Sequence, residues 1–287
     1  MSRGLGDVYK RQEKENGVAV LTMNRPEARN AMSGEMNEAM RNVLSTVELD
    51  PTIRCVVLTG AGKGFCAGGD VKGMASSGDG TVGDNTIDAA IHRQRVHQRA
   101  TAGKLFKMPK PTIAALPGAA AGAGLSYALA CDLRVMANNA IMTTAFAKVG
   151  FSGDYGGSYF MTQLIGSAKA RELYFLSDRV SAEEALNLGL TNWVCEPDEL
   201  MNKTMEIANK LANGPSVAYR YMKENLNRAM NGEVDDCLDL EATHHIHCGQ
   251  TEDHRNATKA FVEKKEPIFK GKSVSYTHLT LPTRIFV

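Results

Sequence analysis

The chain has 287 residues, of which 43% are hydrophobic and 23% charged, and its formal net charge is +1. This composition is typical of a globular protein, and the balanced charge gives no reason to expect binding to nucleic acid or to an anionic membrane. No apolar run approaches the roughly 18 residues that span a bilayer. The six cysteines form no CxxC pair, so we expect reduced thiols and a cytoplasmic location.

The two ends of the chain do not resemble parts of a natural protein. Residues 1–12 and 274–287 match in-frame translations of a common sequencing adapter, most clearly in the stretches DVYKRQ and VSYTHLTLPT. We expect both ends to be adapter-derived and exclude them from the fold prediction. They carry a net charge of +3, so the native segment, residues 13–273, has a net charge close to −2.

The first part of the native segment alternates strand and helix patterns. Ser33 is a suitable N-cap for an amphipathic helix, which the pair Asp50-Pro51 ends. In chain order we predict a strand over 18–23, a helix over 34–49, a strand over 55–58, a glycine- and serine-rich loop over 73–88 and a polar helix over 87–106.

The second part continues this alternation and then becomes helical. The predicted elements are a strand over 112–116, a buried helix over 125–130, short strands over 133–136 and 140–143, and a helix that opens from the glycine turn 150–157 and runs through 165. Ser181 is a suitable N-cap for a further helix. We therefore predict an α/β core over 13–200 and a C-terminal helical region over 201–273.

Two glycine-rich turns, residues 60–70 (GAGKGFCAGGD) and 118–124 (GAAAGAG), each follow a predicted strand. A strand, a turn of small residues and a helix together present bare backbone N–H groups, which bind oxyanions and phosphates. Two such turns predict two converging N–H donors. The alternatives are two tight turns without a ligand, or a nucleotide loop. The nucleotide loop is disfavoured because Gly64 follows Lys63 where Ser or Thr would hold magnesium.

Five stretches share the pattern of one known family: residues 24–32 (NRPEARNAM), 58–70, 111–124, 181–190 (SAEEALNLGL) and 260–264 (AFVEK). Together they resemble the crotonase superfamily of enoyl-CoA hydratases and isomerases, over essentially the whole native segment. The resemblance implies the α/β crotonase fold, a spiral of ββα units, with a C-terminal helical region through which subunits trimerise.

The resemblance also implies the residues of the site. In this family two backbone amides bind the thioester oxygen of an acyl-CoA, and the matching positions are Gly69 and Ala123. Fixed donors of this kind stabilise an enolate oxyanion in a water-poor site. The positions that match CoA contacts are Ala28, Ala67, Asp70, Val71 and Lys72. We expect no metal and no cofactor beyond the coenzyme A moiety of the substrate.

The positions that select the reaction differ from those of the family's hydratases. Ser126 and Phe146 replace the two glutamates that place water across a double bond. Asp154 stands where isomerases, including the one that acts on the ring epoxide of phenylacetyl-CoA degradation, carry a catalytic Asp. A related dehalogenase uses an Asp there as a nucleophile. Without the resemblance, N-capping of the following helix accounts for Asp154 equally well.

We therefore expect an acyl-CoA isomerase in which Asp154 moves a proton and Phe146 keeps water out. Burial is expected to raise the pKa of Asp154. The alternatives are a hydratase, a hydrolase or dehalogenase with Asp154 as nucleophile, and a non-catalytic relative that binds CoA or RNA. The resemblance implies a homotrimer, or a hexamer formed by two trimers.

Other candidate residues receive structural interpretations. Cys66 lacks an evident His partner, so we expect a buried thiol rather than a nucleophile. His244, His245 and His247 do not converge on one helix face, so we expect them on a solvated surface rather than at a metal. Tyr155 either orients Asp154 or packs against the core.

Overall fold

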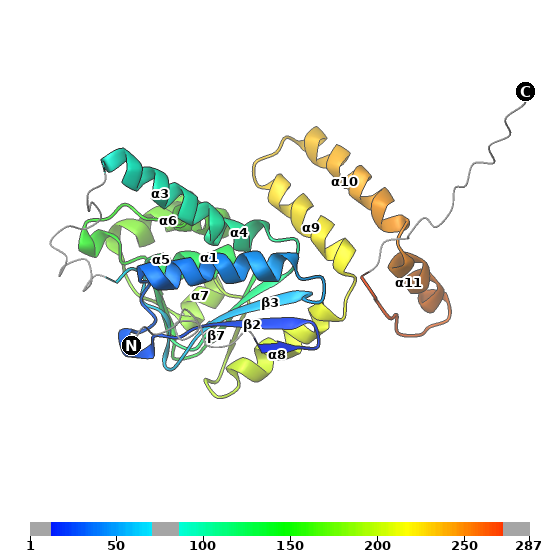
Figure 1. The fold of residues 1–287 in the computed structure, drawn as a ribbon, viewed down its shortest axis with the longest axis horizontal. Coiled ribbons are helices and arrows are strands. Elements are labelled where there is room, and N and C mark those ends of the chain that lie inside the picture. Colours follow the sequence, from blue (N-terminus) through cyan, green and yellow to red (C-terminus); the bar gives the residue numbers. More distant parts are fainter. Residues whose placement is uncertain (1–12, 71–85, 272–287) are drawn as a thin grey trace, which may run out of the picture. The chain divides into compact units, whose positions relative to one another are not determined.

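The structure is a computed structural model that describes residues 13–70 and 86–271 (Figure 1). The chain divides after Ala212 into two compact units, each of which is described by itself. No helix within the described ranges is long and apolar enough to cross a bilayer. The two adapter-like ends and most of the loop predicted over 73–88 lie outside the described residues.

A six-stranded sheet forms the centre of the first unit. Its order is β1-β2-β3-β5-β7-β10, and only β1 runs antiparallel to its neighbour. Every residue of β3 is buried, as expected for a parallel strand covered on both faces. The strands are β1 Glu13–Glu15, β2 Val18–Met23, β3 Cys55–Gly60, β5 Thr112–Leu116, β7 Leu133–Ala137 and β10 Trp193–Cys195.

A second, smaller sheet has the order β4-β6-β8-β9. Its strands are β4 Gly64–Cys66, β6 Ala119–Ala121, β8 Ile141–Thr143 and β9 Val180–Ser181. The chain thus passes from β3 to β4, from β5 to β6 and from β7 to β8, one strand in each sheet. This arrangement confirms the predicted spiral of ββα units. Strands β4 and β6 lie inside segments predicted as turns, because three residues are too few for a periodic pattern to reveal a strand.

The helices of the first unit are α1 Gly34–Leu49, α3 Ile87–Ala100, α4 Ala102–Lys107, α5 Ala123–Ala130, α6 Gly157–Leu176, α7 Ala182–Leu188 and α8 Leu200–Ala212, with 3-10 turns η1 Pro26–Ala28 and η2 Ala147–Val149. Both predicted N-caps are confirmed. Ser33 Oγ accepts from the Met36 amide, and Ser181 Oγ accepts from the Glu184 amide, each at 3.2 Å.

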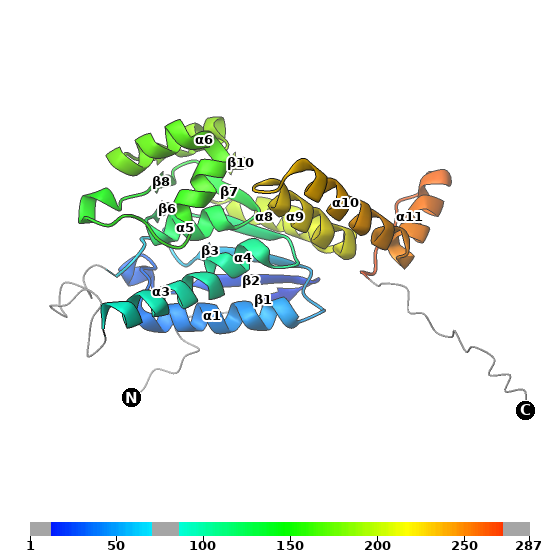
Figure 2. The same ribbon diagram turned by 90° about the horizontal axis from the view of Figure 1, so that it is seen from above.

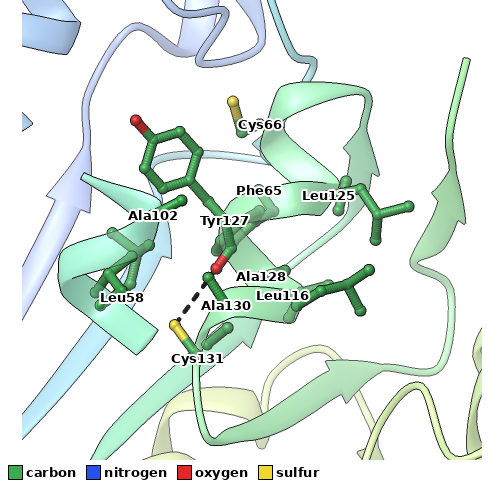
Figure 3. Close-up of a cluster of buried hydrophobic side chains, with 14 of the residues drawn as sticks. Leu58, Phe65, Cys66, Ala102, Leu116, Leu125, Tyr127, Ala128, Ala130 and Cys131 are labelled. Carbon is green, nitrogen blue, oxygen red and sulfur yellow. Dashed lines mark hydrogen bonds between the residues drawn. The ribbon is translucent and has the colours of Figure 1, made fainter. Parts of the chain in front are cut away.

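Helices cover both faces of the large sheet (Figures 1 and 2). One face packs against α8, through β3 and β5 side chains such as Val57 and Ile113. The other face packs against α1, α4 and α5. Every residue of α5 is buried, and Leu58 of β3 and Leu116 of β5 belong to the same buried cluster (Figure 3). The second glycine turn therefore opens a helix that lies wholly inside the core.

Two boundaries differ from the sequence-based expectation. The helix predicted over 87–106 breaks at Thr101, whose hydroxyl donates to His97 O at 2.6 Å. The break separates α3, which has no buried side chain, from α4, which turns Ala102 and Leu105 into the core. The predicted core ends at 200, whereas α8 still packs on the sheet and the units divide after Ala212.

The second unit contains α9 Ser216–Ala229, α10 Val234–Gly249 and α11 Glu252–Val262. Helices α9 and α10 pack side by side. The expectation that His244 lies on a solvated surface is wrong. Its ring stacks on Tyr221 with centroids 4.2 Å apart, its Nδ1 lies 2.5 Å from Asn225 Oδ1, and only 7% of the residue is exposed. The hydrophobic pattern of α10 does not predict this contact, because His244 is polar and its partners Tyr221 and Asn225 lie on another helix, α9.

Candidate functional site

The two glycine turns pack backbone against backbone. Gly68 has φ +91°, and a Cβ there would lie 2.8 Å from Ala121 O and 3.4 Å from Ala123 N. A Cβ at Gly124 would lie 2.6 Å from Cys66 Cβ. Contacts this close exclude any side chain at these glycines. The structure therefore brings together the two turns that the sequence analysis predicted to converge.

The amides of Gly69 and Ala123 donate no hydrogen bond to another of the described residues. A bridge joins Gly69 to Met32, but its bonds run from Met32 N to Gly68 O and from Asp70 N to Met32 O. Ala123 is the first residue of α5, where backbone N–H groups have no partner inside the helix. The end of α5 also carries a partial positive charge. These two amides thus have the chemistry of an oxyanion site.

The residues expected at CoA lie on two paired loops. The Ala67 amide donates to Arg29 O at 3.0 Å, which holds the loop after β4 against the turn that contains Ala28. The Asp70 carboxylate forms an ion pair with Arg25 at 3.0 Å. Ala28, Ala67 and Asp70 therefore belong to one surface. Val71 and Lys72 lie outside the described residues.

Asn30 organises these loops, a role that the sequence pattern did not predict. Its side chain accepts from the Arg25 amide at 2.9 Å and donates to Ala61 O at 2.9 Å and to Gly64 O at 2.8 Å. The residue is fully buried and has φ +57°. Asparagine tolerates a positive φ and its short amide side chain can bond to nearby backbone, so an Asn within a polar loop is the sequence signal for a residue of this kind.

Asp154 lies in a turn of unusual backbone conformation. Gly153, Tyr155 and Gly156 all have positive φ, of +114°, +48° and +79°. The N-cap of α6 is Gly156, with no side-chain capping bond, so the alternative that Asp154 caps this helix is wrong. Asp154 Oδ1 is buried without a hydrogen-bond partner among the described residues. Strained turns with unsatisfied buried groups cluster at functional sites.

The Asp154 carboxyl is surrounded by groups that do not neutralise it. Burial raises its pKa from the ordinary 3.8 of an aspartate to about 6. The negative charge of Asp154 contributes in turn to raising the pKa of Tyr155 and Tyr174, and of the Cys66 thiol, after the larger effect of their own burial. A carboxylate of this kind is a base that titrates near neutral pH.

Ser126 and Phe146 connect Asp154 to the second glycine turn. Ser126 Oγ lies 3.0 Å from Asp154 O and 3.3 Å from Gly122 O, so one hydroxyl spans both turns. Phe146 is 6% exposed, stacks on Tyr174 with centroids 5.9 Å apart, and would lie 3.6 Å from a Cβ at Gly122. These two positions therefore supply a hydroxyl and an apolar wall, and neither supplies a carboxylate.

Two further residues have the surroundings of structural groups. Cys66 is fully buried, its thiol donates to Asn30 O at 3.1 Å, and burial raises its pKa. The prediction of a buried thiol is confirmed. The Tyr155 ring packs on Tyr127 with centroids 5.1 Å apart, while its backbone amide donates to Gln98 Oε1 at 2.7 Å. Tyr155 therefore packs against the core and also ties the Asp154 turn to α3.

A cavity of about 450 Å³ opens at the carboxyl ends of β2 and β3, beside Leu200 and Met201 of α8. It is lined neither by the two glycine-turn amides nor by Asp154. The Thr59 hydroxyl at its wall already donates to Ala115 O at 2.9 Å. The candidate site is therefore the junction of the three turns, where two amides and one carboxylate oxygen lack hydrogen-bond partners within the part of the chain that the structure describes.

Comparison with known proteins gives consistent matches along the chain. Residues 13–272 match the family model described as enoyl-CoA hydratase/isomerase. The chain is 37% identical to a short-chain-enoyl-CoA hydratase of Clostridium acetobutylicum, over 88% of this chain and 94% of the relative. It is 36% identical to a 1,2-epoxyphenylacetyl-CoA isomerase of Escherichia coli, over 90% and 97%. A solved structure of an enoyl-CoA hydratase from Polaromonas sp. JS666 aligns with a TM-score of 0.83 and 32% identity, over 90% and 98%.

Proposed function

The chain belongs to the enoyl-CoA hydratase/isomerase family, and on this premise we propose that it is an acyl-CoA isomerase. One observation carries the choice of reaction. At the junction of the three turns, Asp154 supplies a carboxylate whose buried Oδ1 has no hydrogen-bond partner among the described residues, whereas Ser126 and Phe146 occupy the positions at which hydratases of the family have glutamates. An isomerase needs one base that takes and returns a proton, so one carboxylate is sufficient.

In this proposal the Gly69 and Ala123 amides bind the thioester oxygen of the substrate. Removal of a proton beside the thioester places negative charge on that oxygen, and two fixed donors stabilise the resulting enolate. Both amides lack an acceptor among the described residues. The turns that carry them cannot relax, because Gly68 and Gly124 each lie directly against the opposite turn. They therefore need no reorganisation when the charge develops.

Asp154 is the proton shuttle. For a 3-enoyl-CoA, the Asp154 carboxylate takes a proton from the carbon next to the thioester and returns it two carbons further along. The double bond moves from the 3- to the 2-position without net gain or loss of a proton. Phe146 and Tyr174 surround this step with aromatic carbon, which disfavours attack by water.

The same proposal assigns the remaining partners. Ala28, Ala67, Asp70, Val71 and Lys72 contact the CoA moiety, and no other cofactor takes part. The loop that pairs Ala67 with Arg29 supports this assignment for the described residues. A homotrimer, or a hexamer of two trimers, is supported by large apolar side chains exposed on the second unit: Met222, Leu226, Val234, Leu238, Ile246 and Phe261.

A hydratase is the second candidate, and the observation in its favour is the 37% identity to a named hydratase. A hydrolase or dehalogenase that uses Asp154 as a nucleophile is the third. Both require water at the reacting carbon or at a covalent ester, and Phe146 stands where a hydratase glutamate would hold that water.

The test offers the protein a 3-enoyl-CoA, a 2-enoyl-CoA and a ring-epoxide CoA. We expect migration of the double bond or rearrangement of the epoxide without addition of water. Replacing Asp154 by Asn should lower kcat by about 10²–10⁴-fold, the usual contribution of a general base. Rapid hydration of the 2-enoyl-CoA, or full isomerase activity in Asp154→Asn, would contradict the proposal. A covalent ester trapped on Asp154 would favour the nucleophilic mechanism, and tight binding without turnover would favour a binding protein.

A further inference from the structure

One peptide group in the site is held from both sides by side chains. The peptide between Asp154 and Tyr155 has its carbonyl oxygen 3.0 Å from Ser126 Oγ and its N–H donating to Gln98 Oε1 at 2.7 Å. Ser126 belongs to α5 and Gln98 to α3, so two separate helices fix the plane of this one peptide. A peptide plane fixed in this way sets ψ of Asp154 and φ of Tyr155, and with them the direction of the Asp154 side chain.

The backbone around this peptide needs such support. Gly153, Tyr155 and Gly156 all have positive φ, and Tyr155 is not a glycine. A non-glycine residue in this region costs about 1–2 kcal/mol, so a turn of this kind persists only where its surroundings over-determine it. The only bond within the turn itself to the same peptide is from the Gly157 amide to Asp154 O, at 3.1 Å, among the described residues. The two side-chain bonds provide the rest.

Helix α3 is suited to this role. Gln94 and Gln98 are four residues apart and thus lie on one face of α3, and both reach Tyr155. Gln94 hydrogen-bonds the Tyr155 hydroxyl, and Gln98 accepts from its amide. No residue of α3 is buried, so this polar face is not explained by core packing.

We infer that Gln98 and Ser126 are positioning residues of the proton-transfer step, which clamp the Asp154–Tyr155 peptide and aim the Asp154 carboxylate at the substrate. The inference rests on the proposed function of Asp154. Neither residue touches the transferred proton. Ser126 belongs to α5, whose first residue is Ala123, so its bond to Asp154 O ties the turn that carries the carboxylate to the second glycine turn.

The test replaces each side of the clamp separately. Gln98→Met keeps the length of the side chain and removes the acceptor, and Ser126→Ala removes only the donor. Each should lower kcat by roughly 10–100-fold, as expected for a misplaced catalytic group, while KM for the acyl-CoA changes by less than about twofold. Gln98→Glu restores the acceptor oxygen, so it should recover kcat at high pH while its negative charge shifts the pH profile upward. Gln163→Met, the same change at an exposed glutamine of α6, is the matched control.

The outcomes separate this inference from the proposed function. If Asp154→Asn is inactive while Gln98→Met and Ser126→Ala keep the wild-type kcat, the clamp is refuted and the proposed function stands. If Asp154→Asn is fully active, the proposed function fails. Amide hydrogen exchange at Tyr155 tests the clamp without reference to any reaction. The clamp predicts slow exchange that becomes faster in Gln98→Met, and equal rates in the two proteins would overturn it. Should Gln98→Met lose its cooperative melting transition, Ser126→Ala supplies the same kinetic test from the other side.

Discussion

The two glycine turns and the turn that carries Asp154 lie side by side but are built in opposite ways. In the glycine turns the candidate groups are backbone amides, and the side chains are small because the two turns are in contact. In the Asp154 turn the candidate group is one side chain, and the backbone is held in a strained form by Ser126 and Gln98. The glycine turns therefore depend on positions that have no side chain, whereas the Asp154 turn depends on one particular side chain.

This difference accounts for what each region specifies. Converging amides stabilise any oxyanion at the same place, so the glycine turns fit a thioester enolate without selecting what happens to it. A buried carboxylate without a counter-ion selects proton transfer at a defined pH. Substitutions that act on the glycine turns and spare the Asp154 turn, or the reverse, test this difference.

The largest effect is expected from a side chain in the glycine turns. A Cβ at Gly124 would meet Cys66 O and lie 2.6 Å from Cys66 Cβ, which the packed turns cannot accommodate. Gly124→Ala should therefore lower the free energy of unfolding by more than about 4 kcal/mol, or prevent folding. The matched control is Gly64→Ala, since a Cβ there meets nothing within 4 Å. Urea unfolding measures both, and a similar loss in the two variants would contradict the contact between the turns.

The next effect concerns the loop that supports the first turn. Asn30→Ala removes three buried hydrogen bonds and places alanine at φ +57°. We expect a loss of roughly 3–4 kcal/mol in the free energy of unfolding. Asn42→Ala, at an exposed position of α1, should change stability by less than about 0.5 kcal/mol. Equal stability of Asn30→Ala and the wild type would show that this side chain does not organise the loops.

Removal of the charged group from the Asp154 turn should raise the free energy of unfolding, whereas the two preceding substitutions lower it. Its folded pKa of about 6 lies above the unfolded value, so ionisation destabilises the folded state as pH rises from about 4 to 6, and the penalty is complete above that range. Asp154→Asn should be more stable than the wild type by roughly 2–3 kcal/mol at pH 8 and equally stable at pH 3. Thermal melting at both pH values tests this, with exposed Asp178→Asn as the control. A wild type that is the more stable protein at pH 8 would mean that the carboxylate is paired.

The smallest effect is expected in the pH dependence of the reaction. If Asp154 acts as a base in its ionised form, kcat/KM should rise tenfold per pH unit below about 6 and become constant above it. At pH 5 the rate should be about one-tenth of its plateau, a difference of about 1.4 kcal/mol. In the proposed mechanism Gly69 and Ala123 act through amides that do not titrate, so they add no second transition. A rate that falls as pH rises from 5 to 7 would exclude this role for Asp154.

Much of the fold could be predicted because its signals are local. The strand over 18–23, the N-caps Ser33 and Ser181 and the buried helix after the second turn follow from patterns within a few residues. Strands β4 and β6 escaped prediction because their three residues acquire strand geometry only by pairing with each other. The contact of His244 with Tyr221 was missed for a related reason, since the two residues belong to different helices.

Residue types alone predict that two glycine turns present backbone amides, because glycines after an apolar strand restrict the local backbone in a recognisable way. The absence of a carboxylate at Ser126 and Phe146 is also read directly from the sequence, because it depends only on the residue type. Three properties of Asp154 depend on the packing of distant elements: it does not cap α6, its Oδ1 has no partner among the described residues, and α3 and α5 hold its peptide. Burial and hydrogen bonding of one group depend on residues up to 57 positions away, and packing alone brings these residues together.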